Sequence, residues 1–223
     1  MKQSLQNIID ILMNPKAAFT RLKDEPKWVV VFIIYCLFSF ILAWTLMPYT
    51  QKLLAEPQSV DTVSYNRTHA FIFITVFSMV YTIMMAILLS GVLTLIARIA
   101  KIESGIKFKH ICAAFFHIML IRVMTFLVNA GLLPVFRDIE DIRTTLDARV
   151  IPGLHLLAGS LENQHLLIFL AYINPVAVWY VFVLTLGIHI FAEISKVKAF
   201  FVALIIWLFR MSLDTTFVAV FLS

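Results

Sequence analysis

The clearest shortage in this chain of 223 residues is charge, because Asp, Glu, Lys and Arg together make up only 14% of it. Hydrophobic residues make up 61%, and the mean hydropathy is +0.94. A soluble domain of this length needs much more polar surface. Uncharged stretches of about 18 residues or more, the length that crosses a bilayer, occur several times. The composition therefore excludes an ordinary soluble domain and indicates an integral membrane protein.

Sequence motifs of enzymes are also lacking. The chain has no GxSxG, HExxH or phosphate-binding loop, and no two carboxylates face each other inside an apolar stretch. Cys36 and Cys112 lie in apolar stretches and form no CxxC pair, so we interpret them as packing residues. We therefore expect a non-enzymatic protein with no catalytic residues, no metal and no cofactor.

The net charge of +5 does not indicate a nucleic-acid partner. The basic residues are scattered among loops, and they form no cluster interleaved with aromatic residues. Dispersed Lys and Arg between apolar stretches are typical topology signals and contacts for lipid headgroups. The expected partners are therefore membrane lipids, anionic ones included, and a partner membrane protein or a second copy of the chain.

Residues 1–27 are predicted to form a separate amphipathic segment in the cytoplasm. Apolar residues recur in its first half at the spacing of one helix face, namely Leu5, Ile8, Ile9, Leu12 and Met13. Asn14 and Pro15 then offer an N-cap and a proline at the first helical position, so a second helix should follow. Flanking basic residues favour helices that lie at the headgroups. The alternative is that the segment docks on the protein's own loops.

Residues 28–223 are predicted to form one all-α membrane domain with five spans. We place these spans at about 28–47, 70–97, 111–133, 174–193 and 199–222. Pro48 and Pro134 are expected to end the first and third spans, because proline breaks a regular helix. Between the third and fourth spans, helical spacing predicts a surface helix that ends at Pro152 and Gly153 and carries Ile139, Ile142, Leu146 and Val150.

The fourth span is predicted to begin at Asn174 and Pro175. Leu166 to Ala192 is an apolar run of 27 residues. As one helix it would measure about 40 Å, too long for a hydrocarbon core of about 30 Å. Asn174 as N-cap and Pro175 at the first helical position turn the pair into a start signal. The residues before it then form a broken, re-entrant or tucked helix, and protein or a wet cavity must cover the junction.

Lys and Arg are divided unevenly between the two sets of loops. The amino-terminal segment, the loop after the second span and the turn before the fifth carry eleven, whereas the other loops carry five. The positive-inside rule then places the amino terminus in the cytoplasm. With five spans, the carboxyl terminus is expected outside.

Arg122, Arg210 and Asp214 are charged residues well inside the predicted spans, where each costs at least about 2.5–3.5 kcal/mol at the centre of a helix. Arg122 and Arg210 each come eleven residues into an outward-running span, so we expect them at similar depth. Asp214 lies one turn beyond Arg210 on the same helix face. Asn129 shares a face with Arg122. These four residues, Arg122, Arg210, Asp214 and Asn129, form the candidate ligand-binding or lipid-binding site.

Two interpretations of these charges stay open. In the first, Arg122, Asp214 and Arg210 form a structural ion network that joins two helices. In the second, the surplus positive charge is completed by a lipid phosphate or another anion, because guanidinium groups bind phosphate through two hydrogen bonds. His189 and Glu193, four residues apart, are predicted to be a hydrogen-bonded pair rather than a metal site, which would need more ligands.

Three stretches resemble a known family. They are "LMNPKAAFTRLKDEP" before the first span, "NPVAVWYVFVLTLGIHIF" in the fourth and "SKVKAFFVALIIWLF" in the fifth. They are similar to the Yip (Ypt-interacting protein) domain family in its compact bacterial form. The resemblance implies a five-helix membrane domain in a bacterial inner membrane. Eukaryotic relatives act with prenylated Rab-type GTPases, but this sequence lacks their long cytosolic amino-terminal region, so no such partner is expected.

The leading functional hypothesis is a non-enzymatic inner-membrane protein that binds lipid or a partner membrane protein and helps to organise an efflux or envelope system. The alternative is a small transporter or lipid-moving protein. It would use Arg122, Arg210 and Asp214 together with the covered junction at Asn174, because discontinuous helices near the midplane are a device of transporters.

Overall fold

The computed structural model describes residues 2–55, 67–99, 107–159, 161 and 163–221. All regular structure in these residues is helical. The α-helices are α1 (Lys2–Met13), α2 (Pro15–Asp24), α3 (Val29–Ala55), α4 (Arg67–Ile99), α5 (Phe108–Phe136), α6 (Gln164–Ala171), α7 (Pro175–Ala192) and α8 (Lys196–Phe221). Two 3₁₀ turns, η1 (Ile139–Asp141) and η2 (Leu154–Leu157), lie between α5 and α6.

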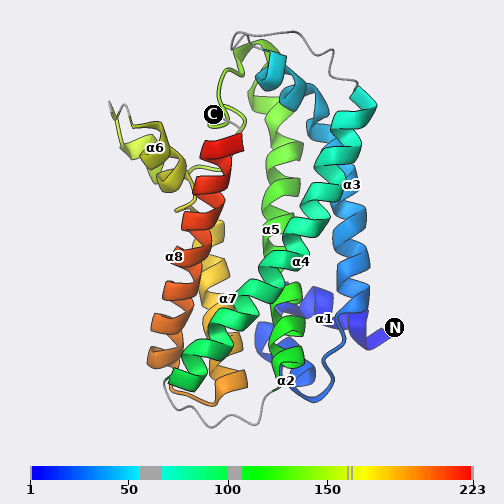
Figure 1. Cartoon of the computed structure of the whole chain (residues 1–223), viewed down its shortest axis with the longest axis vertical. Helices are drawn as coiled ribbons and strands as arrows, with labels where there is room; N and C mark the ends of the chain where they lie inside the picture. Colours follow the sequence, from blue (N-terminus) through cyan, green and yellow to red (C-terminus); the bar gives the residue numbers. More distant parts are fainter. Residues whose placement is uncertain (1, 56–66, 100–106, 160, 162, 222–223) are drawn as a thin grey trace.

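The five long helices run along the longest axis of the molecule (Figure 1). Helices α1 and α2 lie together at one end of this bundle, which we call the α1–α2 end. The last turns of α8 lie toward the opposite end, as does α6, which packs against α8. Helix α1 and the last turns of α8 therefore lie toward opposite ends of the molecule.

Four helices of the described part are long and apolar enough to cross a membrane. The apolar segments are Val29–Tyr49, Thr75–Ile99, Phe108–Phe136 and Pro175–Ala192. The prediction of an all-α membrane protein is confirmed to this extent. The predicted fifth span corresponds to α8, which is not one of the four and which carries Arg210 and Asp214; its predicted last residue, 222, lies outside the described residues.

The two prolines predicted to end spans do not end them. Helix α3 continues past Pro48 to Ala55, and α5 continues past Pro134 to Phe136. A proline removes only its own donated hydrogen bond, and membrane helices tolerate it because neighbouring groups can satisfy the freed carbonyl. The predicted boundaries at 47 and 133 are therefore too early.

The predicted surface helix over residues 139–150 is also wrong. Beyond η1, this segment forms a turn whose polar side chains bind its own backbone. The Asp147 carboxylate accepts hydrogen bonds from the backbone N–H groups of Arg143 and Thr144, at 3.1 and 2.8 Å. The Thr144 hydroxyl in turn accepts one from the N–H of Asp147 at 3.3 Å. Such local bonds compete with helix formation, which explains why helical spacing misled the prediction.

Helix α7 begins at Pro175, as the Asn-Pro pair predicts. Asn174 is its N-cap, and the side-chain oxygen accepts a hydrogen bond from the N–H of Ala177 at 3.0 Å. The amide nitrogen of Asn174 donates to the carbonyl of Ala171 at 3.2 Å, so this one side chain also holds the end of α6. Helices α6 and α7 are separate helices in the structure.

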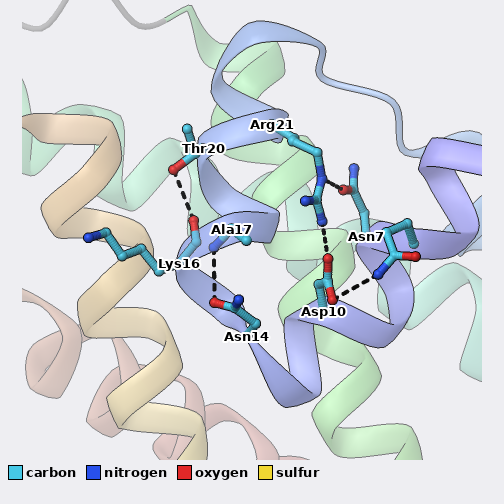
Figure 2. A network of polar contacts seen from close by, with 8 residues as sticks. Asn7, Asp10, Asn14, Lys16, Ala17, Thr20 and Arg21 are labelled. Carbon is cyan, nitrogen blue, oxygen red and sulfur yellow. Dashed lines mark hydrogen bonds and ion pairs between the residues drawn. The ribbon is translucent and has the colours of Figure 1, made fainter.

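Polar contacts join α1 to α2 (Figure 2). Nε of Arg21 donates to the side-chain oxygen of Asn7 at 2.7 Å, and the same guanidinium forms an ion pair with Asp10. Burial raises the pKa of Asp10, but hydrogen bonds from Arg21 and Gln6 outweigh it and leave the pKa below its usual value. The carboxylate therefore stays charged at neutral pH, and the two helices form one hairpin.

Helix α2 packs against α5 and α7 as well as against α1. The Phe19 ring is fully buried and makes an edge contact with the Phe191 ring, with centroids 6.0 Å apart. It also lies directly over Gly187, where a Cβ would approach the ring to 3.0 Å. At the rim, Lys23 pairs with Glu193 and lowers the pKa of that carboxyl.

The predicted pair of His189 and Glu193 is therefore not what the structure contains. Glu193 turns to Lys23, while Nδ1 of His189 lies 2.6 Å from the carbonyl oxygen of Ile194. Glu193 is the C-cap of α7 and adopts a left-handed conformation with φ of 53°, so the helical spacing between positions 189 and 193 does not continue through it. Sequence spacing alone assumes that the helix continues, and here it does not.

Replacing Gly187 by Ala should loosen the docking of α2. The new methyl group would press on the Phe19 ring, and overfilling a packed site typically costs about 1 kcal/mol or more. Gly91→Ala is the matched control, because a Cβ there meets nothing within 4 Å. We expect faster hydrogen exchange of the α2 amides in Gly187→Ala and unchanged exchange in Gly91→Ala. Equal exchange in the two variants would contradict this packing.

Candidate functional site

Arg122, Arg210 and Asp214 lie together inside the bundle. Nη1 of Arg122, on α5, lies 3.3 Å from Oδ1 of Asp214 on α8. Nε of Arg210, one turn earlier on α8, lies 3.7 Å from Oδ2 of the same carboxylate. The side chains of Arg210 and Asp214 are only 8% and 7% exposed, whereas 22% of the Arg122 side chain is exposed. One carboxylate is therefore shared by two guanidinium groups.

Aromatic residues complete this cluster, and the sequence analysis did not find them. The hydroxyl of Tyr81, on α4, donates a hydrogen bond to Oδ1 of Asp214. The guanidinium carbon of Arg122 lies 5.4 Å from the Tyr81 ring centroid and 5.2 Å from that of Phe126, and Arg210 lies 4.8 Å from the Tyr180 ring. Such cation–π contacts stabilise cations away from water. The sequence indicates a role for Tyr81 beside the charged cluster only weakly, through the presence of a tyrosine in an apolar span.

A cavity of about 420 Å³ lies beside the cluster. Arg122, Arg210 and Asp214 all line it. The remaining lining comes mostly from apolar and aromatic side chains, among them Leu46, Ile121, Phe126, Val176, Trp207 and Met211. This combination of apolar walls and a few convergent polar groups is typical of a small-molecule or lipid site.

The other predicted site residues, Asn129 and Asn174, also line this cavity. Both amides are engaged with backbone groups. Asn174 caps α7, and Asn129 binds the loop after α5, donating to the carbonyl of Ala148 and accepting from the N–H of Val150, each at 2.7 Å. Asn129 was predicted as a ligand-binding residue. In the structure its amide holds a loop that covers the cavity.

Arg149, in that loop, is a third arginine that lines the cavity. From the sequence Arg149 is predicted only as a charge in a loop, because residue spacing does not indicate that the loop folds back over the bundle. With Arg122 and Arg210 against Asp214, the cavity has three guanidinium groups and one carboxylate. Burial and the nearby charge of Arg149 lower the pKa of His155, which keeps that ring neutral at pH 7. The formal charge around the cavity is therefore +2.

This arrangement suits the binding of an anion. Three of its four charged groups are cationic, and the one carboxylate is already paired with Arg122 and Arg210. Guanidinium groups present paired N–H donors that match a phosphate or carboxylate. The geometry provides positive charge at the polar part of the cavity and apolar surface for a hydrocarbon chain.

The chain was compared with known families and proteins. The sequence profile described as Yip1 domain matches residues 9–213. No curated protein matches the chain, and no solved structure matches it. The match begins within α1, includes α2 to α7 and ends within α8.

Asp214→Asn should destabilise the fold more than Arg122→Gln. The first change leaves two buried guanidinium groups without a carboxylate, and removing one partner of a buried ion pair costs about 3–5 kcal/mol. The second leaves Asp214 with Arg210 and Tyr81, so we expect a loss of about 1.5 kcal/mol, the scale of one charged hydrogen bond. Reversible denaturation in mixed micelles measures both free energies of unfolding. A larger loss in Arg122→Gln would show that Asp214 is not the shared centre.

Proposed function

Because the chain belongs to the Yip1 domain family of membrane proteins, we propose that it is a non-enzymatic inner-membrane protein that binds an anionic lipid in the cavity between α5, α7 and α8. The observation that carries this proposal is the cavity lined by Arg122 and Arg210, whose shared carboxylate balances only one of the two charges. A buried surplus charge is costly unless a counter-ion accompanies it. A lipid phosphate supplies such a counter-ion.

The dimensions and lining of the cavity support a lipid headgroup with part of its chain. A volume of about 420 Å³ lies within the usual range of ligand sites, roughly 300–1,000 Å³. Ile121, Trp207 and Met211 offer apolar surface next to the arginines. A fully hydrated inorganic ion would leave this apolar surface without a partner, whereas an acyl chain would cover it.

We place α8 across the membrane as a fifth crossing. Its 26 residues measure about 39 Å as a helix, which is long enough for the hydrocarbon core. Arg210 and Asp214, toward the middle of the helix, are buried in the protein, whereas Lys196 and Lys198 are exposed in its first turn. Its outer face exposes Phe200, Phe201 and Ile205. Five crossings agree with Figure 1, in which α1 and the last turns of α8 lie toward opposite ends of the molecule. The distribution of Lys and Arg then favours a cytoplasmic amino terminus and an external carboxyl terminus.

Helix α1 is proposed to lie at the cytoplasmic headgroups. Its protein-facing side buries Ser4, Asn7 and Ile11. Three apolar side chains at i, i+4 and i+8 face away from the protein, namely Leu5, Ile9 and Met13, with exposures of 44%, 57% and 80%. An exposed apolar stripe on a helix beside basic residues is typical of interfacial binding. Of the predicted stripe, Leu5, Ile9 and Met13 are thus exposed, whereas Ile8 and Leu12 are partly buried against the hydrophobic core.

A lipid-moving or transporting activity is the second candidate function. It is favoured by the position of Asn174, which lines the same cavity as the arginines and marks a break between two helices. Broken helices beside a buried site are a recurring feature of transporters. In that case Arg122 would matter for flux as well as for binding.

Arg122→Ala should reduce the retention of anionic lipid by about tenfold, because it removes the more exposed guanidinium of the cluster, and tenfold corresponds to about 1.4 kcal/mol. Native mass spectrometry of the purified protein with phosphatidylglycerol measures the retention. Arg137→Ala is the control, because Arg137 is exposed at the end of α5 and does not line the cavity. Equal retention in all three proteins would reject the lipid site and leave the cluster as a structural ion network.

Reporter fusions should place the two chain ends on opposite sides of the membrane. Green fluorescent protein should fluoresce when fused to the amino terminus, because it folds in the cytoplasm. Alkaline phosphatase should be active when fused to the carboxyl terminus, because it requires the oxidising exterior. Both ends on one side would rule out α8 as a fifth crossing and with it the proposed orientation.

A further inference from the structure

The cavity is covered by a loop that contributes its own cationic side chain. We call residues 142–151 the cover loop. Thr145, Ala148, Arg149 and Ile151 of this loop line the cavity. Ile142 anchors the beginning of the loop, since it is fully buried in a small cluster with Tyr49 and Leu133. The cover loop is thus a packed wall of the cavity.

Asn129 fixes the position of Arg149 in this wall. Its amide donates to the carbonyl of Ala148 and accepts from the N–H of Val150, both at 2.7 Å. These two residues flank Arg149, so one side chain of α5 clamps the backbone on both sides of the arginine. An Ala side chain at 129 could form neither bond.

The Arg149 side chain is oriented by an aromatic contact. Its guanidinium carbon lies 4.3 Å from the centroid of the Tyr172 ring, just before the break between α6 and α7. In the part of the chain that the structure describes, no carboxylate forms an ion pair with Arg149. Arg149 therefore differs from Arg122 and Arg210, which share Asp214. Its charge is available to a ligand.

We propose that Arg149, positioned by Asn129, makes the cavity selective for a lipid headgroup that carries two negative charges. This inference rests on the proposed lipid-binding function. Arg122 and Arg210 against Asp214 leave one surplus positive charge, which a phosphodiester with one negative charge would balance. Arg149 adds a second. A phosphomonoester headgroup, which carries about −1.5 to −2 at pH 7, balances both.

The distinction follows from electrostatics in a site of low dielectric. Charges there interact more strongly than in water, so an unbalanced unit charge costs more than it would at the surface. A singly charged headgroup would leave one guanidinium without a counter-ion. The specificity-determining residue is then Arg149, and Asn129 is a positioning residue that acts through it.

The test compares phosphatidic acid, a phosphomonoester, with phosphatidylglycerol, a phosphodiester, in nanodiscs that contain the full-length protein. We expect the parent protein to prefer phosphatidic acid by about tenfold, equivalent to about 1.4 kcal/mol. Arg149→Gln should bring the preference close to one while binding of phosphatidylglycerol persists. Arg143→Gln is the matched control, because Arg143 is exposed in the same loop and does not line the cavity. It should keep the parent preference.

Two further variants separate positioning from general damage. Asn129→Ala should reduce the headgroup preference as Arg149→Gln does, although the arginine is still present. Arg149→Lys should restore much of the preference, because it keeps the charge. A merely structural role of the loop would change the melting temperature without changing the ratio of the two lipids. An unchanged preference in Arg149→Gln would overturn the inference.

The outcomes distinguish this inference from the proposed function. If Arg122→Ala abolishes binding of both lipids while Arg149→Gln changes nothing, the lipid site stands and the headgroup selectivity fails. If neither Arg122→Ala nor Arg149→Gln affects lipid binding, the lipid site and the headgroup selectivity are both rejected. Inorganic phosphate serves as a separate probe, since the same two charges can come from a soluble ion. Competition by inorganic phosphate at lipid concentrations would assign the site to soluble phosphate and overturn the lipid headgroup.

Discussion

The structure depends on a single carboxylate that is shared by two guanidinium groups inside a helix bundle. Asp214 on α8 contacts Arg122 on α5 and Arg210 on its own helix, and it accepts a hydrogen bond from Tyr81 on α4. Neither arginine could lie at this depth without a partner, because an unpaired charge away from water is strongly disfavoured. The requirement that these groups meet fixes where α4, α5 and α8 can lie relative to one another.

The same requirement explains why a cavity exists beside the cluster. Three charged side chains and three aromatic rings are bulky and directional, and they fill the space between helices less evenly than aliphatic side chains do. The cover loop and α6 then close over the space that the helices leave, held by Asn129 and Asn174. Both asparagines use their amides to support backbone, so the cationic side chains remain the groups able to bind a ligand.

The parts of this arrangement that follow helical geometry could be predicted from the sequence. Equal depth in two parallel helices brings Arg122 to Asp214, and an Asn-Pro pair starts α7 at Pro175. The parts of the arrangement that are set by tertiary contacts could not be predicted from the sequence. The turn at Thr144 and Asp147 follows from side chains that capture nearby N–H groups, and Arg149 reaches the cavity only because its loop folds back. Proline at 48 misled because it removes a single hydrogen bond, too little to end a long apolar helix.

Helix α7 connects the cavity to the α1–α2 end. Asn174 caps its first turn beside the arginines, and its last turns hold α2 through Gly187, Phe191 and the ion pair of Glu193 with Lys23. A helix of 18 residues with bonded backbone is stiff along its axis, so a displacement at one end is carried to the other. One element therefore supports both features: a change at Asn174 alters the wall of the cavity, and a change at Gly187 alters the docking of α2.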